Sequence, residues 1–334
     1  MNASPKKNAE TAENRKKLNM KVIIADNLTK IYPGGKKALD SVDLSVEEGG
    51  IFGFLGPNGA GKTTAVKLFS GMLQLTEGSC RVLGTDPARS PEETHKICGV
   101  VTEHAQMYNN LTGLANLMFF GSVFGINENE TKRRAMEILE RLSLLDAKDQ
   151  KLREYSTGMR QKLSLARALI HQPKILFLDE PASGLDPESA QNVNNLIKNL
   201  ARNEGTTVFL CTHQLRYAEE ICTQYGLISE GKMLACGSPE ELHSLAFSGL
   251  TLKLKVEGGD LSIPGKRVGI EHTGANCNEL RIEINSSDEI PGIVRNFVDS
   301  GGKVYHVSAH KHSLEEIYFA LIEKRGSRET MNDK

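Results

Sequence analysis

The sequence predicts an α/β fold with a mainly parallel sheet, followed by a small α+β unit at the C-terminal end. Two buried-strand patterns, residues 174–178 and 207–211, flank a helical stretch at 187–202. A strand, helix, strand order of this kind is typical of parallel sheets covered by helices on both faces. Residues 250–256 and 280–284 instead alternate apolar and polar side chains strictly, as antiparallel strands with one wet face do. The second pattern therefore predicts a separate antiparallel sheet.

Further elements follow along the chain in order. Residues 1–20 are polar and lysine-rich and predict a disordered tail. The β-rich runs that follow lie at residues 22–24, 42–46 and 50–55, and the last of them has the pattern of a buried strand. Between about 104 and 165 the pattern becomes helical and predicts a helical subdomain, with one apolar face along residues 132–145.

The chain divides into two predicted domains, residues 21–245 and residues 250–334. In the second, the pattern predicts a helix at 288–299, a strand at 303–307 and a last helix that begins at Ser313. Ser313 with Glu316 three residues later forms a capping-box pattern, which predicts where that helix starts.

Charge and composition exclude some classes of function. There are 41 Lys and Arg against 42 Asp and Glu, so the net charge is −1 and we predict no nucleic-acid partner. The longest apolar stretch, residues 117–126, is about half of the roughly 18 to 20 residues that span a bilayer. Any membrane role is therefore expected to come through a partner. The six cysteines form no C-x-x-C pair and no metal-ligand spacing, which is typical of a reduced, cytoplasmic protein.

The most informative segment follows the strand at 50–55. It fits the P-loop pattern G-x-x-x-x-G-K-[ST] and consists of Gly56, Pro57, Asn58, Gly59, Ala60, Gly61, Lys62 and Thr63. Its glycines let backbone N–H groups turn toward phosphate oxygens at a helix N-terminus. Lys62 would reach the β- and γ-phosphates, and the Thr63 hydroxyl would ligate Mg²⁺, with Thr64 beside it among the nucleotide-binding residues. The flanking strand and helix disfavour the alternative, a glycine-rich turn with a chance lysine.

Two carboxylates end the strand pattern at 174–178. Asp179 is placed to hold Mg²⁺, directly or through water, and Glu180 to orient and polarise an attacking water. Alone, such a pair is more often a solvated loop entry. With a P-loop in the same chain, phosphoryl transfer becomes the favoured interpretation.

These motifs and others in order make the chain resemble the nucleotide-binding subunit of an ABC transporter. The further elements are the signature-like run Tyr155-Ser156-Thr157-Gly158-Met159-Arg160-Gln161, the D-loop-like Ser183-Gly184-Leu185-Asp186, His213 at the switch-histidine position, and Tyr32 at the position of the ring that stacks on adenine. The resemblance implies a P-loop NTPase fold, an ABC-type nucleotide-binding domain with a helical subdomain, and hydrolysis of ATP with Mg²⁺. Glu180 and His213 would then be the catalytic residues.

The resemblance also implies partners. In this family two domains pair head to tail, so that Ser156 and Gly158 of one would contact the γ-phosphate held by the P-loop of the other, with Asp186 nearby. A homodimer is the simplest case. A separate transmembrane permease would hold the subunit at the cytoplasmic face of the cell membrane.

Two departures from the family pattern affect the site. The signature is Tyr-Ser-Thr-Gly-Met rather than Leu-Ser-Gly-Gly-Gln, but the serine and the second glycine remain. Glu103 occupies the position of the usual Q-loop glutamine, where a carboxylate can still ligate Mg²⁺ but adds negative charge near the triphosphate. Gln106 is the alternative for this position.

The run from Ser313 to Phe319 resembles the ending of ATPase subunits in drug-resistance-like, type-2 ABC exporters. We therefore predict an exporter ATPase that drives a separate permease. The alternative is a non-transport ABC ATPase acting in translation or DNA repair, and a regulatory module without turnover is disfavoured because Asp179, Glu180 and His213 are all present. The transported substrate is not encoded in this chain.

Overall fold

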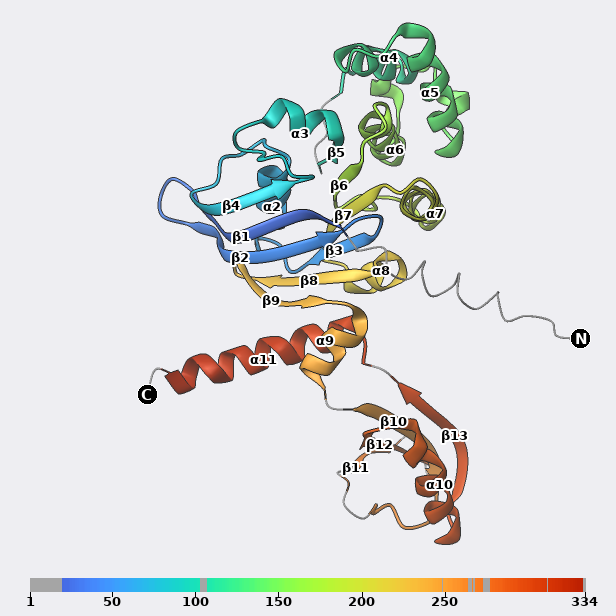
Figure 1. The fold of residues 1–334 in the computed structure, drawn as a ribbon. Helices are drawn as coiled ribbons and strands as arrows, with labels where there is room; N and C mark the ends of the chain where they lie inside the picture. The colour runs from blue at the N-terminus through green and yellow to red at the C-terminus, as the bar shows by residue number, and fades with distance from the viewer. Residues whose placement is uncertain are drawn as a thin grey trace, which may run out of the picture. The chain divides into compact units, whose positions relative to one another are not determined.

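The computed structural model (Figure 1) describes residues 20–102, 107–247, 249–263, 266, 268–272, 277–310 and 312–332. The predicted tail, apart from Met20, and the candidate residues Glu103 and Gln106 lie outside these residues. The chain forms two compact units. The first runs to His213 and also contains Ile221–Met233, and the second contains Gln214–Glu220 and Leu234–Lys334.

A six-stranded sheet with the order β5-β6-β7-β3-β8-β9 forms the centre of the first unit. Its strands are β3 (Ile51–Leu55), β5 (Cys98–Val101), β6 (Ile175–Asp179), β7 (Thr207–Thr212), β8 (Gln224–Ser229) and β9 (Lys232–Gly237). The pairs β5–β6, β6–β7, β7–β3 and β3–β8 are all parallel. All residues of β3, β6 and β7 are buried, which explains why their sequences are apolar runs without alternation. The predicted parallel sheet is thus confirmed.

A second, antiparallel sheet of the first unit has the order β2-β1-β4. Its strands are β1 (Lys21–Ile31), β2 (Lys37–Glu47) and β4 (Glu77–Val82). Helix α2 (Lys62–Phe69) contacts β2 and β4 of this sheet and also β6 and β7 of the parallel sheet. Rings from α2, β3, β6 and β7 pack together with centroids 5.4 to 6.3 Å apart, and they belong to Phe52, Phe54, Phe69, Phe177 and Phe209. This core anchors the helix that follows the P-loop.

Helices α4 (Gly113–Val123), α5 (Glu128–Arg141) and α6 (Thr157–Leu169) contact one another and form the helical part of the first unit, coloured green in Figure 1. Helix α3 (Pro91–Ile97) precedes β5, and α7 (Pro187–Asn203) lies between β6 and β7 in the chain. The predicted helix at 132–145 is corrected at its end. Leu142 is the C-cap of α5, and Ser143 has a positive φ of 55°, so the helix cannot continue to residue 145.

The second unit contains an antiparallel sheet with the order β11-β12-β10-β13. The strands are β10 (Leu250–Glu257), β11 (Val268–His272), β12 (Asn278–Ile284) and β13 (Lys303–His310). The alternating apolar side chains of β10 and β12 pack against Ile293 and Phe297 of α10 (Ile290–Asp299). The predicted helix at 288–299 begins at Ile290, because Ser287–Glu289 forms a 3-10 turn first.

Helices α8 (Leu215–Ile221), α9 (Pro239–Ala246) and α11 (Leu314–Asn332) complete the fold. The capping box before α11 is confirmed. The Ser313 N–H donates to Glu316 Oε2 at 2.8 Å, and the Glu316 N–H donates to Ser313 Oγ at 3.2 Å. In the part of the chain that the structure describes, every helix is too short or too polar to cross a membrane.

Candidate active site

The P-loop connects the buried strand β3 to helix α2. Gly61 is the N-cap of α2 and has a φ of 109°, a conformation that costs little only for glycine. A Cβ atom at Gly61 would also collide with the Ala38 carbonyl oxygen, and one at Gly56 would collide with the Ile228 carbonyl oxygen. At both positions the neighbouring backbone leaves no room for a side chain, so the loop requires glycine there.

The ammonium group of Lys62 lies inside this loop. Its Nζ donates to the carbonyl oxygens of Gly56 at 2.7 Å and of Pro57 at 3.1 Å. The residue is 6% exposed, so its charge is largely removed from water and compensated by two backbone dipoles. A cation held in a loop of this shape at a helix N-terminus favours the binding of a phosphate group.

Thr63 and Asp179 bring two oxygen donors together at the ends of α2 and β6. The Thr63 hydroxyl donates to Asp179 Oδ2 at 2.6 Å, and Asp179 is 3% exposed. Hydroxyl and carboxylate oxygens are ligands that Mg²⁺ accepts, and it commonly takes few protein ligands alongside phosphates and water. In octahedral coordination at about 2.1 Å, neighbouring ligand oxygens lie about 3 Å apart. The Thr63 and Asp179 oxygens, which lie 2.6 Å apart, would therefore fit around a Mg²⁺ ion once they move slightly apart.

Glu180 follows β6 in a strained conformation and is held by three hydrogen bonds. Its φ is 51°, which is unusual for a residue with a side chain and is a feature often found at functional sites. His213 donates to Oε1 from its backbone N at 2.9 Å, and its ring Nδ1 lies 2.7 Å from the same oxygen. The Thr212 hydroxyl donates to Oε2 at 2.8 Å. The carboxylate is therefore fixed in direction at the edge of the P-loop.

These residues share one pocket of about 210 Å³. It is lined by Tyr32, Lys36, Ala38, Asn58, Gly59, Gly61, Lys62, Thr63, Thr64, Asp179 and Glu180. The Tyr32 hydroxyl lies 3.4 Å from Thr64 Oγ1 in α2. The structure thus brings an aromatic ring, a phosphate-binding loop and two carboxylates together, and His213 adjoins them through Glu180.

Ser156, Gly158 and Asp186 do not line this pocket. Ser156 is the N-cap of α6 and accepts a hydrogen bond from Met159 N at 3.2 Å. Asp186 is the N-cap of α7 and accepts one from Ser189 N at 2.9 Å, which lowers the pKa of its carboxyl group. A Cβ atom built on Gly158 would lie 3.3 Å from the Leu185 side chain, so these two helix starts are neighbours. Within one chain they form a second group of residues, separate from the P-loop pocket.

Tyr155, the first departure in the signature, has a structural role. Its hydroxyl donates to the Ala147 carbonyl oxygen at 2.7 Å, and the residue is 5% exposed. Burial raises the pKa of this hydroxyl. The tyrosine therefore connects the start of α6 to the loop after α5.

Three residues of the site were not found from the sequence: the pocket residues Lys36 and Ala38, and Thr212, which bonds to Glu180. Lys36 directly precedes β2 and Ala38 is the second residue of that strand, where the sequence offers no motif. Thr212 is brought to Glu180 by the parallel register of β6 and β7, in which Asp179 pairs with Cys211, and no sequence motif reveals that register. The residue after each partner, Glu180 and Thr212, then lies at the same sheet edge.

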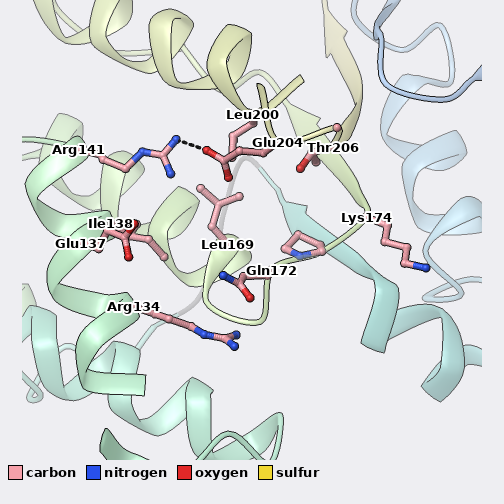
Figure 2. Close-up of a pocket in the computed structure, with 12 residues that line it drawn as sticks. Arg134, Glu137, Ile138, Arg141, Leu169, Gln172, Lys174, Leu200, Glu204 and Thr206 are labelled. Carbon is pink, nitrogen blue, oxygen red and sulfur yellow. Dashed lines mark hydrogen bonds and ion pairs between the residues drawn. The ribbon is translucent and has the colours of Figure 1, made fainter. Parts of the chain in front are cut away.

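A larger cavity of about 380 Å³ lies elsewhere in the first unit, between α5, the α6–β6 loop and the α7–β7 loop (Figure 2). Arg141 and Glu204 on its wall form an ion pair at 2.7 Å. Among the described residues, none of those predicted for the site, the P-loop included, lines this cavity. The chemistry therefore belongs to the smaller pocket.

Comparison with known proteins identifies the class. The family model described as ABC transporter matches residues 39–183. A daunorubicin resistance ATP-binding protein of Streptomyces coeruleorubidus is 35% identical over 90% of this chain and 95% of its own length. A bacitracin transport ATP-binding protein of Bacillus licheniformis is 36% identical over 90% of this chain and 97% of its own length.

Solved structures of ABC transporter ATP-binding proteins also match this chain. An ATP-binding subunit of an ABC transporter matches with a TM-score of 0.62 and 26% identity, over 67% of this chain and 92% of that one. A dimeric ATP-binding cassette in a post-hydrolysis state bound to ADP and Pi matches with a TM-score of 0.60 and 26% identity, over 65% and 98%.

The chain therefore belongs to the ABC transporter family of ATP-binding proteins. The predicted fold class, the ATP ligand and the ATP-hydrolysing activity are confirmed. The alternative, a non-transport ABC ATPase of translation or repair, receives no support, because the relatives cited here are named for transport or resistance.

Proposed function

We propose that two copies of this chain pair head to tail around two ATP molecules and drive a separate membrane permease. The observation that carries this proposal is the separation of Ser156 and Gly158 from the pocket formed by the P-loop, Asp179 and Glu180. Ser156 is the N-cap of α6 and Gly158 lies in its first turn, where the backbone N–H groups of a helix are suited to a phosphate. A second chain would bring them to the γ-phosphate.

In the proposed site, Lys62 binds the β- and γ-phosphates and Tyr32 stacks on the adenine ring. Thr63 and Asp179 hold Mg²⁺, which supplies positive charge to neutralise the phosphates. Glu180 accepts a proton from the attacking water. The water oxygen forms a bond to the γ-phosphorus, and the bond between the γ-phosphorus and the oxygen shared with the β-phosphate breaks. His213 orients the carboxylate of Glu180 through two hydrogen bonds to its Oε1 atom. The roles of Asp179, Glu180 and His213 are supported by their positions at the ends of the neighbouring strands β6 and β7.

The permease and the export direction come from the relatives. Proteins similar over nine tenths of this chain are named for daunorubicin resistance and for bacitracin transport. Together with the absence of a membrane-crossing helix among the described residues, these names support an exporter whose membrane part is another chain, with this subunit on the cytoplasmic face of the membrane. Co-expression with a candidate permease that carries membrane-spanning helices, followed by purification through a tag on that permease, tests the pairing. Recovery of the ATPase only when the permease is present would support it.

The catalytic assignment is tested with Glu180→Gln. We expect the turnover of Mg-ATP to fall by at least about 100-fold, because an amide cannot accept the proton of the water. ATP affinity should stay within about two-fold. The matched control is Glu140→Gln, a similar charge removal on the exposed side of α5, which should hydrolyse ATP at the wild-type rate. Wild-type turnover by Glu180→Gln would show that another group activates the water.

A further inference from the structure

Thr212 is the residue at the end of β7, one position before His213. It is 1% exposed, and its hydroxyl donates to Glu180 Oε2 at 2.8 Å. The two hydrogen bonds from His213 both go to the other carboxylate oxygen, Oε1. Thr212 therefore bonds Oε2 while His213 bonds Oε1, and the plane of the carboxylate depends on both residues.

The position of this hydroxyl is itself determined by its surroundings. Thr212 lies opposite Leu55 in the parallel pairing of β3 with β7, directly before the P-loop. Its carbonyl oxygen accepts a hydrogen bond from Gly56 N. A β-branched side chain on a buried strand has few accessible rotamers, so the Oγ1 atom is held in place relative to both the P-loop and Glu180.

Glu180 needs such support because its own backbone is unfavourable. With a φ of 51°, the residue is retained in its conformation only by surrounding contacts. These contacts include the bond from Glu180 N to the Cys211 carbonyl oxygen at 2.9 Å. Backbone and side chain of Glu180 are thus both tied to residues 211–213 of the neighbouring strand.

We infer that Thr212 is a positioning residue for ATP hydrolysis, which holds Oε2 of Glu180 in the direction needed to accept a proton from water. The inference rests on the proposed role of Glu180 as the general base. A carboxylate can accept about four hydrogen bonds, so Oε2 keeps room for a water molecule beside the Thr212 hydroxyl. Fixing the acceptor in this way acts on the chemical step and leaves the binding of ATP by the P-loop unchanged.

The test compares Thr212→Val, Thr212→Ser and Thr212→Ala in the full-length chain. Valine keeps the branched shape and removes the hydroxyl, and serine keeps the hydroxyl. We expect Thr212→Val and Thr212→Ala to lower kcat for Mg-ATP about 10- to 100-fold. KM should stay within about two-fold, and Thr212→Ser should recover kcat to within about three-fold of wild type.

Thr207→Val is the matched control. Thr207 begins the same strand, is also 1% exposed, and its hydroxyl accepts a hydrogen bond from Gly49 N at 2.9 Å. It lies roughly 16 Å from Thr212 along the strand. This variant loses a comparable buried hydrogen bond far from Glu180, so its kcat should stay within about two-fold of wild type.

The double variant Thr212→Val with Glu180→Gln separates this inference from the proposed function. If Thr212 acts through Glu180, the double variant should hydrolyse ATP no more slowly than Glu180→Gln alone. Wild-type kcat in Thr212→Val, or a serine variant as slow as the valine one, would overturn the inference. If Glu180→Gln itself turns over normally, it is the proposed base that fails.

Discussion

At the scale of single residues, the chemistry depends on side chains that end neighbouring strands. Asp179 ends β6 and Glu180 follows it, and Thr212 ends β7 and His213 follows it. Sequence motifs predicted three of these four residues, because they recur at recognisable spacings. Thr212 was missed since its role depends on a pairing between strands that are 32 residues apart in sequence. A motif can predict which residue types are present. The register between neighbouring strands decides which of these residues contact one another.

His171 is a buried titratable residue outside the active site. Its ring stacks on Phe124 with centroids 3.9 Å apart, and its Nε2 lies 3.1 Å from the Cys98 carbonyl oxygen, which requires this nitrogen to donate. Among the described residues, the buried Nδ1 atom has no hydrogen-bond partner. Burial lowers the pKa of His171 to about 4 from its ordinary value of 6.5. The folded chain therefore resists protonation of this ring.

A pH dependence of stability follows. As the pH falls from about 6.5 toward about 4, the unfolded chain binds a proton that the folded chain does not bind, so the free energy of unfolding decreases. Between pH 7 and pH 5 this loss should amount to about 1 to 2 kcal/mol. His171→Gln keeps a donor for Cys98 and cannot titrate, so it should lose that much less stability over the same range. Urea unfolding of the wild type and of His171→Gln at pH 7 and pH 5 measures this loss of stability. Equal losses in the two proteins would contradict the lowered pKa of His171.

At the scale of elements, fully buried apolar strands and a long amphipathic helix were predictable, whereas strands that bury few residues or contain very few residues were not. Strands β6 and β7 and helix α7 were expected within one or two residues of their observed ends. Strands β4 and β5 were not expected, because β4 buries only two of its six residues and β5 has only four residues. Such segments become strands through pairing with distant neighbours, and their own patterns are too weak to show it.

The start of helix α6 depends on the departure at Tyr155. Removing the hydroxyl in Tyr155→Phe would leave the buried Ala147 carbonyl oxygen without this donor, so we expect a loss of about 1 to 2 kcal/mol in the free energy of unfolding. The exposed residue Tyr108, substituted in Tyr108→Phe, is the control and should change stability by less than about 0.5 kcal/mol. Chemical denaturation of the three proteins gives the comparison. Equal stability of all three would show that the hydrogen bond contributes nothing to the fold.

At the scale of the whole molecule, the C-terminal sheet belongs to a unit that also contains Gln214–Glu220 and the chain from Leu234 onward. Lys324 of α11 donates to the carbonyl oxygens of Leu245 and Ala246 at the end of α9, 78 or more residues earlier. Contacts over such separations leave no pattern in the sequence, where only the composition change near residue 249 is visible. The domain limits 21–245 and 250–334 therefore stay predictions.

The pairing of two chains is the central claim at this scale. A free chain should be monomeric, and ATP should join two chains because each nucleotide would contact the P-loop of one and Ser156 of the other. Glu180→Gln stops hydrolysis, so the paired form should accumulate with Mg-ATP. With Mg-ADP, which lacks the γ-phosphate, the chains should remain single.

Light scattering behind a sizing column measures this directly. For Glu180→Gln we predict a mass of 36.6 kDa with Mg-ADP and twice that value with Mg-ATP. Lys62→Ala in the same background removes the cation that binds the phosphates and should remain at 36.6 kDa with either nucleotide. A Glu180→Gln chain that carries bound ATP and still elutes at the mass of one chain would contradict the shared site.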